Sequence, residues 1–176
     1  LINSQVRNTK NYVVEALHSS VKAAGCELSE ASGGIVRLVG GNHIFNQCTI
    51  ANYYLFTALG GPAVQLSHVT PDDADVNGDG QPVDLPFMTA DFTNTIIYGN
   101  GTDISHGDLE GTAVTLRRCL LKSKGEDDDN FIECLWDKDP LYNTKREEYI
   151  FDYTLQEESP ARGAAYPDFI LLETAA

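Results

Sequence analysis

The motif Gln47-Cys48-Thr49-Ile50-Ala51-Asn52 returns in related form along most of the chain. Its other copies are Ile2-Asn3-Ser4-Gln5-Val6, Gly25-Cys26-Glu27-Leu28, Thr93-Asn94-Thr95-Ile96-Ile97-Tyr98 and Arg118-Cys119-Leu120-Leu121. Aligned on the Asn or Cys, the copies are spaced 23, 22, 46 and 25 residues apart, and 46 is twice 23. A period of this size is typical of stacked repeats, in which each repeat buries its apolar face against its neighbours.

Short runs rich in β-branched residues lie between the copies of the motif, at positions 12–14, 34–39, 64–66 and 113–116. Gly, Asn and Asp separate these runs, which is typical of strands connected by turns. A helix over 13–24 is the alternative for one stretch, since Val14, Leu17 and Val21 follow a helical spacing. Because the β-branched residues there favour extended backbone and the repeat needs strands, we expect strands.

Two strand-based solenoids compete for such a period. A leucine-rich repeat needs regularly placed leucines around its Asn, and this chain lacks them. In a parallel β-helix, successive coils lie about 4.8 Å apart, so equivalent positions stack on one another. An Asn side chain can bond to the equivalent group one coil away, and a small Cys fits a tight inward corner. The sequence therefore predicts an all-β parallel β-helix with coils of about 22–25 residues.

Several longer motifs carry a family resemblance. They are residues 47–54, residues 92–99, Asp139-Pro140-Leu141-Tyr142, and Asp152-Tyr153-Thr154-Leu155 followed by Ser159-Pro160-Ala161. With them the chain resembles the right-handed parallel β-helix family. More narrowly, it is similar to the pectate-lyase-like surface proteins of polysaccharide-degrading bacteria, in which the Asp-Pro-(Leu/Phe) and Ser-Pro-Ala motifs mark the last coils. In one departure, Arg162-Gly163 stands where that family usually continues with an acidic residue and Gly.

The resemblance implies how the chain is organised. Residues 1–163 are expected to form C-terminal coils, with an acidic loop inserted at 70–86, and 164–176 a tail or cap. Residue 1 already lies inside a copy of the motif, so we expect the β-helix to be truncated on its N-terminal side, with the upstream part of the same polypeptide as a partner. The family implies secretion or display on a bacterial cell surface, with the export signal upstream.

The charge balance excludes some partners. The chain has 26 acidic and 12 basic residues, a net charge of −14 and a pI near 4.4. Such a surface repels phosphate backbones and anionic lipids, which argues against nucleic-acid binding and electrostatic membrane docking. No apolar run approaches the ~18 residues that a membrane-spanning helix needs. We therefore expect a protein that does not span the membrane and has no nucleic-acid partner.

An acidic segment is the candidate metal site. Asp73, Asp75 and Asn77 alternate ahead of a Gly, and Asp84 follows at the spacing of an EF-hand calcium loop, with an overlapping frame that includes Asp79. Ca²⁺ needs several oxygen ligands that converge at about 2.3–2.6 Å. The prolines that follow break any exit helix, so a true EF-hand is not expected. An Asx-rich turn whose side chains bond to their own backbone is the alternative to a calcium-bound loop.

Aromatic side chains beside the motif can bind sugars, which stack on exposed aromatic faces. Tyr53, Tyr54 and Tyr98 lie in or next to strand motifs and are the candidate carbohydrate-binding residues. Alternation along a strand turns one of Tyr53 and Tyr54 outward, and core packing is the alternative for all three. The function predicted first is a non-catalytic surface or secreted module associated with polysaccharide or glycan binding.

Catalysis by a polysaccharide lyase or a glycoside hydrolase, with a substrate that can contain uronic acids, is the alternative function. A lyase needs Ca²⁺ or a basic residue to neutralise the uronate and a base to remove the C–H proton. The basic residues near the later coils are Arg117, Arg118, Lys122 and Lys124. A hydrolase needs two or three carboxylates across one groove. Those available are Asp91, Asp103 and Asp108, which nothing in the sequence groups together, and no catalytic residue is assigned.

The four cysteines contain no C-x-x-C pair, which argues against a zinc site. Three of them, Cys26, Cys48 and Cys119, occupy the repeated position. Cys26 and Cys48 would lie on adjacent coils, close enough for a disulfide. Buried free thiols are the alternative that we favour, because small apolar groups fill such a position well.

The calcium prediction can be tested by chelation. If Ca²⁺ binds the loop at 70–86, EDTA is expected to lower the Tm, because a ligand that binds only the folded chain stabilises it. Asp75→Asn is expected to abolish the shift, whereas Asp129→Asn, in a different acidic run, should retain it. Equal Tm values of the unsubstituted protein with EDTA and with added Ca²⁺ would contradict the site.

Overall fold

The computed structural model describes residues 1–56, 58–68, 88–107, 109 and 112–166. Within these ranges the chain is built of β-strands, together with one 3₁₀ turn, Arg146–Glu148. No helix in the described ranges is long and apolar enough to cross a membrane. The prediction of an all-β fold is confirmed, and the stretch 13–24 holds two strands rather than a helix.

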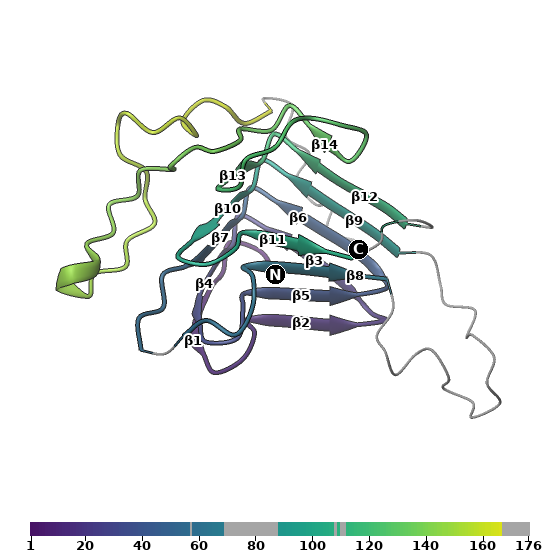
Figure 1. Cartoon of the computed structure of the whole chain (residues 1–176), viewed down its shortest axis with the longest axis horizontal. Coiled ribbons are helices and arrows are strands. Elements are labelled where there is room, and N and C mark those ends of the chain that lie inside the picture. Colours follow the sequence, from purple (N-terminus) through teal and green to yellow (C-terminus); the bar gives the residue numbers. More distant parts are fainter. Residues whose placement is uncertain (57, 69–87, 108, 110–111, 167–176) are drawn as a thin grey trace.

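Three sheets stack the strands in parallel (Figure 1). The first sheet consists of β1 (Gln5–Thr9), β4 (Glu27–Ala31), β7 (Thr49–Asn52), β10 (Ile96–Gly99) and β13 (Leu120–Leu121). The second consists of β2 (Val14–Leu17), β5 (Val36–Val39), β8 (Val64–Ser67) and β11 (Ile104–His106). The third consists of β3 (Ser20–Ala24), β6 (Asn42–Asn46), β9 (Met88–Thr93), β12 (Thr112–Arg117) and β14 (Phe131–Ile132). From β1 to β13 the chain visits the sheets in a fixed cyclic order, which is consistent with a parallel β solenoid.

The register of the first sheet gives the length of each circuit. Gln5 pairs with Glu27, Glu27 with Thr49, Thr49 with Ile96 and Ile96 with Leu120, so successive steps are 22, 22, 47 and 24 residues. The step of 47 is a single circuit, because β7 pairs directly with β10. Reading the corresponding sequence interval as two periods is therefore wrong. The circuit that starts at Thr49 is therefore 25 residues longer than each of the two circuits before it.

The same register corrects the alignment of the motif. The Asn residues and the Cys residues occupy two adjacent positions, not one. The first position has left-handed backbone in every circuit, with φ between 45° and 60°, and its occupants are Asn3, Gly25, Gln47, Asn94, Arg118 and Glu133. We call these residues the left-handed corner. The next position holds Ser4, Cys26, Cys48, Thr95, Cys119 and Cys134, which we call the corner ladder.

Side chains of the corner ladder bond to the backbone on two sides. Each lies within hydrogen-bond distance of the carbonyl two residues earlier, for example Thr95 Oγ1 to Thr93 O at 3.0 Å and Cys26 Sγ to Ala24 O at 3.3 Å. The Thr95 hydroxyl also accepts the Cys48 amide of the preceding circuit at 3.3 Å. A small side chain that both donates and accepts meets this requirement, which explains the choice of Ser, Thr and Cys. All four cysteines are free.

The core lies inside the three sheets and is built from stacked apolar columns. In the first sheet, Leu28, Ile50, Ile97 and Leu121 are in register and fully buried. In the third sheet, Phe45 and Phe92 stack with ring centroids 4.9 Å apart and an interplanar angle of 6°. The alternate residues of each strand point outward, and on the first sheet they form the base of the site described below.

Removing the hydroxyl of Thr95 tests the corner ladder. Thr95→Val keeps the shape of the side chain but leaves the buried Cys48 amide without its acceptor, so the free energy of unfolding should fall by about 1–3 kcal/mol. Thr95→Cys, measured in reducing buffer, restores a donor and acceptor and should lose less. Equal losses for the two variants in urea denaturation would show that the hydrogen bonds do not matter.

Candidate functional site

A C-terminal hairpin lies against the outer face of the first sheet and extends to one side of the stack (Figure 1). Its arms are joined by antiparallel bridges between Tyr142 and Leu155 and between Lys145 and Ile150. The 3₁₀ turn Arg146–Glu148 forms its tip. The hairpin therefore brings residues from the end of the chain next to strands from its first half.

A cluster of tyrosines holds the hairpin on the sheet. The ring of Tyr53, which follows β7, lies 6.3 Å from Tyr98 of β10, 6.3 Å from Tyr142 and 6.0 Å from Tyr153. Tyr142 and Tyr153, on the two arms of the hairpin, meet edge to face at 5.0 Å. Aromatic pairs at such distances each contribute about 0.5–1.5 kcal/mol beyond the area that they bury. We call these four residues the tyrosine cluster.

Glu30, at the end of β4, is buried beneath the hairpin with 2% of its surface exposed. Its Oε1 accepts hydrogen bonds from the Tyr153 hydroxyl and, at 3.1 Å, from the Tyr53 amide. Burial raises the pKa of Glu30 above its ordinary value, while these two donors and the Arg146 guanidinium oppose the shift. Glu30 therefore joins the second circuit to the hairpin, and both donors occupy the same carboxylate oxygen.

The tyrosine hydroxyls of the cluster stay neutral. Burial raises the pKa of Tyr53, Tyr142 and Tyr153, and the neighbouring carboxylates raise it further. Deprotonated tyrosine is thus disfavoured, which argues against these hydroxyls as general bases. The cluster and Glu30 anchor the hairpin on the first sheet.

An open hollow of about 700 Å³ lies beside the hairpin tip, lined by Leu55 and residues 144–149. Two large apolar side chains nearby face solvent: Phe56 is 68% exposed and Tyr149 is 65% exposed. Their rings stack on each other with centroids 6.2 Å apart and an interplanar angle of 15°. Tyr54 meets Phe56 edge to face at 5.4 Å. We call the exposed Phe56 and Tyr149, together with the half-buried Tyr54, the exposed aromatic group.

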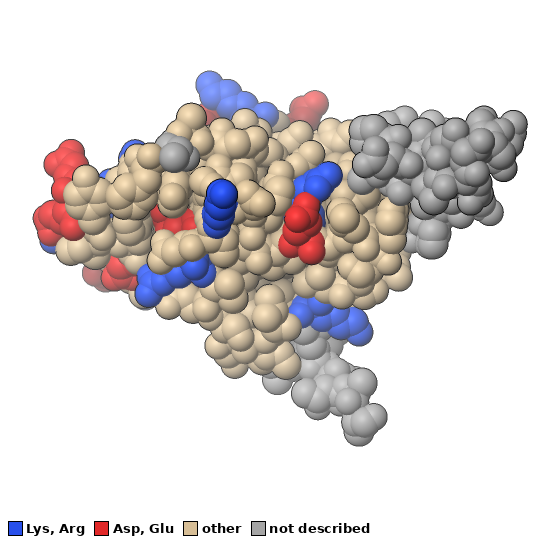
Figure 2. Space-filling view, turned by 90° about the horizontal axis from the view of Figure 1, so that it is seen from below, with Lys and Arg blue, Asp and Glu red and all other residues tan. Residues whose placement is uncertain are grey.

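Charged side chains of both signs border the hollow. Lys145 and Arg146 supply donors, and Glu147 and Glu148 supply acceptors. The Arg146 guanidinium lies 5.8 Å from the centre of the Tyr53 ring, which connects the hollow to the tyrosine cluster. Figure 2 shows acidic and basic side chains together at the left end of the molecule, where the hairpin lies in Figure 1. Flat apolar faces beside paired donors and acceptors suit a ligand that is both ring-shaped and hydroxylated.

The structure separates the three tyrosines that the sequence selected. All three are half-buried, but Tyr53 and Tyr98 pack in the tyrosine cluster, whereas Tyr54 packs against Phe56. Sequence reasoning did not select Phe56 and Tyr149 as site residues. It also did not predict that the hairpin tip lies next to Phe56. Phe56 follows Tyr53, Tyr54 and Leu55 in one apolar run, which was the available signal, but no local pattern pairs it with Tyr149.

The predicted calcium ligands Asp73, Asp75, Asn77, Asp79 and Asp84 lie outside the described residues. Within the described part of the chain, no group of three or more His, Cys, Asp or Glu side chains is placed to hold a metal ion. Calcium binding stays a prediction from the sequence.

The residues considered for catalysis are dispersed. Asp103 is buried and accepts hydrogen bonds from the Ser123 amide and hydroxyl, at 2.8 and 2.9 Å, and Asp91 accepts from Thr93. Asp108 lies outside the described residues.

Three of the four basic residues make local contacts. Arg118 pairs with Glu133 at 2.7 Å, and Lys122 donates to backbone carbonyls of residues 100 and 101. Lys124 lies 3.9 Å from Asp137. These contacts support structural roles.

Comparison with known proteins identified no relative of this chain. A scan against family models, a search of curated proteins and a search of solved structures found no match for this chain. The resemblance to pectate-lyase-like proteins therefore remains a hypothesis from the sequence motifs.

Replacing Glu30 by Gln is expected to change how stability depends on pH. Because burial raises the folded-state pKa of Glu30 above its ordinary value of 4.5, the folded chain binds this proton more tightly than the unfolded chain does. The resulting stabilisation is complete below pH 4.5 and is lost as the pH rises through the folded-state pKa. Glu30→Gln lacks this dependence, so its stability relative to the unsubstituted protein should rise between pH 4.5 and a pH above the folded-state pKa of Glu30. We call this range the Glu30 window.

Urea denaturation at a series of pH values, from about 4 to about 8, measures the difference between the two proteins. Tyr153→Phe removes a donor that favours the charged carboxylate, so it should move the Glu30 window to higher pH. Glu148→Gln, at the exposed tip, is the control and should keep the original dependence. A difference between Glu30→Gln and the unsubstituted protein that does not vary with pH would contradict this account.

Proposed function

We propose that this chain forms right-handed coils of a secreted or bacterial cell-surface parallel β-helix of the pectate-lyase-like type, and that it binds polysaccharide without catalysis. The cyclic order of the parallel strands supports the fold, and the motifs of the last coils support the family. The proposed binding surface is the exposed aromatic group together with the hollow at the hairpin tip.

The observation that carries the proposal is the stacked pair of Phe56 and Tyr149. Two large rings that are each about two thirds exposed leave apolar area in water, and a neighbouring partner chain or ligand is the usual reason for such a group. A pyranose ring has an apolar C–H face that stacks on such rings, while its hydroxyls can bond to Arg146 and Glu148 at the rim.

A polysaccharide lyase or glycoside hydrolase is the second candidate function. The observation in its favour is that Lys145, Arg146, Glu147 and Glu148 line one hollow, because both chemistries use acids and bases that face the same substrate. These residues occupy consecutive positions at an exposed tip, where their side chains are highly hydrated. Such a site is better suited to binding than to proton transfer in a water-excluded pocket.

Binding to an array of neutral and uronic-acid polysaccharides tests the proposal. Phe56→Ala and Tyr149→Ala are each expected to weaken binding about tenfold or more, because each removes one ring of the stacking surface. Leu17→Ala is the matched control: this side chain on β2 is 50% exposed and lies on the second sheet, so binding should be retained.

The same samples are assayed for unsaturated products and for new reducing ends. Binding without product supports the non-catalytic module, and product formation supports the enzyme. Absence of binding to every polysaccharide, or equal binding by Phe56→Ala, Tyr149→Ala and the unsubstituted protein, would overturn the proposed site.

A further inference from the structure

Cys119 and Cys134 are stacked neighbours in the corner ladder. Leu120 pairs with Leu135, so the two cysteines that precede them occupy equivalent positions in the last two circuits. Backbones of neighbouring strands lie about 4.7–4.9 Å apart, which is within the Cα separation that a disulfide spans. Both side chains point to the same corner, since Cys119 Sγ lies 3.6 Å from Arg117 O and Cys134 Sγ lies 3.7 Å from Ile132 O, in each case the carbonyl two residues earlier.

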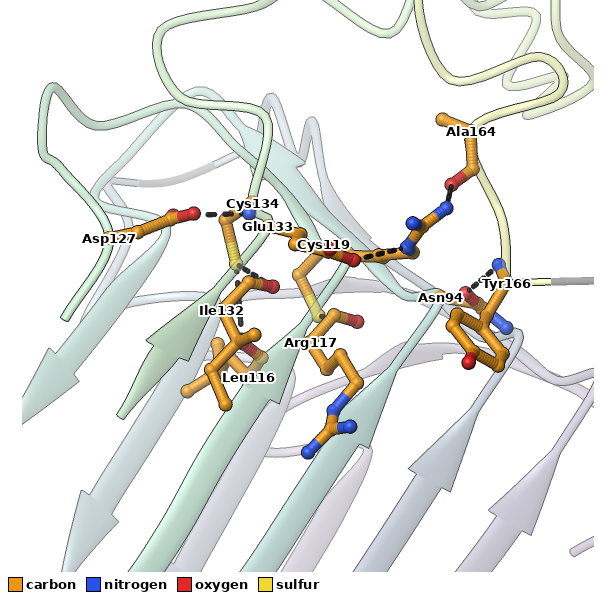
Figure 3. Close-up of polar contacts among 11 residues, drawn as sticks. Asn94, Leu116, Arg117, Cys119, Asp127, Ile132, Glu133, Cys134, Ala164 and Tyr166 are labelled. Atoms are coloured by element: carbon orange, nitrogen blue, oxygen red, sulfur yellow. Dashed lines mark hydrogen bonds and ion pairs between the residues drawn. The ribbon is translucent and has the colours of Figure 1, made fainter. Parts of the chain in front are cut away.

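Both thiols lie close to strand-end carbonyls (Figure 3). Cys119 Sγ lies 3.3 Å from Phe92 O, and Cys134 Sγ lies 3.3 Å from Leu116 O. The proximity of Cys119 lowers the pKa of Cys134, whereas burial raises the pKa of Cys119.

Access to the two sulfurs is unequal. Cys119 is fully buried, whereas Cys134 lies on the last circuit and is partly exposed. A reagent in solution can therefore reach Cys134 but not Cys119. From this geometry we propose that Cys119 and Cys134 form a redox-active dithiol, in which Cys134 is the attacking thiol and Cys119 the resolving thiol, and whose oxidant is a low-molecular-weight disulfide.

The chemistry proceeds by two exchanges. The Cys134 thiolate attacks one sulfur of the small disulfide, forming a mixed disulfide and releasing one thiolate. Cys119, after transfer of its proton to solvent or to the released thiolate, attacks the sulfur of Cys134 and releases the second thiol. The dithiol loses two electrons and two protons, and the small disulfide is reduced to two thiols. The product is a disulfide that joins the last two circuits of the stack.

The other stacked pair, Cys26 and Cys48, supplies an internal control. Both are only 2% exposed, and burial raises the pKa of Cys48 to about 11. Thr95 separates this pair from Cys119 in the ladder. Because both thiols of this pair are buried, the same kind of stacking should leave Cys26 and Cys48 reduced.

Oxidised glutathione is the probe. The folded, reduced protein is incubated with it, unreacted thiols are alkylated after denaturation, and the products are mapped by mass spectrometry. We expect a Cys119–Cys134 disulfide that dithiothreitol reverses, with Cys26 and Cys48 alkylated. A protein that stays fully reduced, or that links Cys26 to Cys48 first, would overturn the proposal without any variant.

Two substitutions separate the roles of the pair. Cys119→Thr, which places at this position the residue found at Thr95, should retain a stable glutathione adduct on Cys134. Cys134→Ser, the residue found at Ser4, should form neither adduct nor disulfide. The double variant Cys26→Ser/Cys48→Thr should react like the unsubstituted protein. Loss of the adduct in folded Cys119→Thr would show that Cys134 is not the attacking thiol.

Discussion

The corner ladder and the left-handed corner beside it determine how this chain stacks. Left-handed backbone is unfavourable for residues other than Gly and Asn. It costs about 1–3 kcal/mol unless the surroundings stabilise it. Here Gln47, Arg118 and Glu133 all adopt it. The next side chain offsets this cost because it bonds both to the carbonyl two residues back and to the amide of the preceding circuit, as Thr95 does. The corner is thus stable only when circuits stack in register.

The register at this corner determines which side chains of each strand face the core and which face outward. A slip by one residue would exchange the inner and outer faces of a strand. With the observed pairing, Ile50 and Ile97 fall in the core, while Ala51 and Tyr98 fall on the outer face of the first sheet. The tyrosine cluster needs that outer face, because its rings contact residues of two neighbouring strands. The site at the hairpin tip therefore depends on hydrogen bonds at the corner that precedes β7 and β10.

The sequence was informative where the structure repeats and uninformative where it does not. Alternating apolar residues and a period near 23 predicted parallel strands, because stacking places the same demand on every circuit. The alignment was one residue off, since the left-handed corner holds side chains as different as Gln47 and Arg118 and shows no common type. The contact of Phe56 with Tyr149 could not be predicted: it joins segments 93 residues apart through a hairpin that belongs to no period.

The hairpin also changes what kind of solenoid this is. In a plain stack each circuit contacts only its neighbours, and stability is close to a sum of nearest-neighbour interactions. Tyr153 bonds to Glu30, 123 residues earlier, so the end of the chain is anchored on the second circuit and crosses the third and fourth. The second circuit cannot separate from the circuits that follow it without breaking the buried hydrogen bond between Tyr153 and the Glu30 carboxylate. Unfolding should therefore be more cooperative than stacking alone allows. The exposed aromatic group includes Tyr149, which lies on this anchored hairpin.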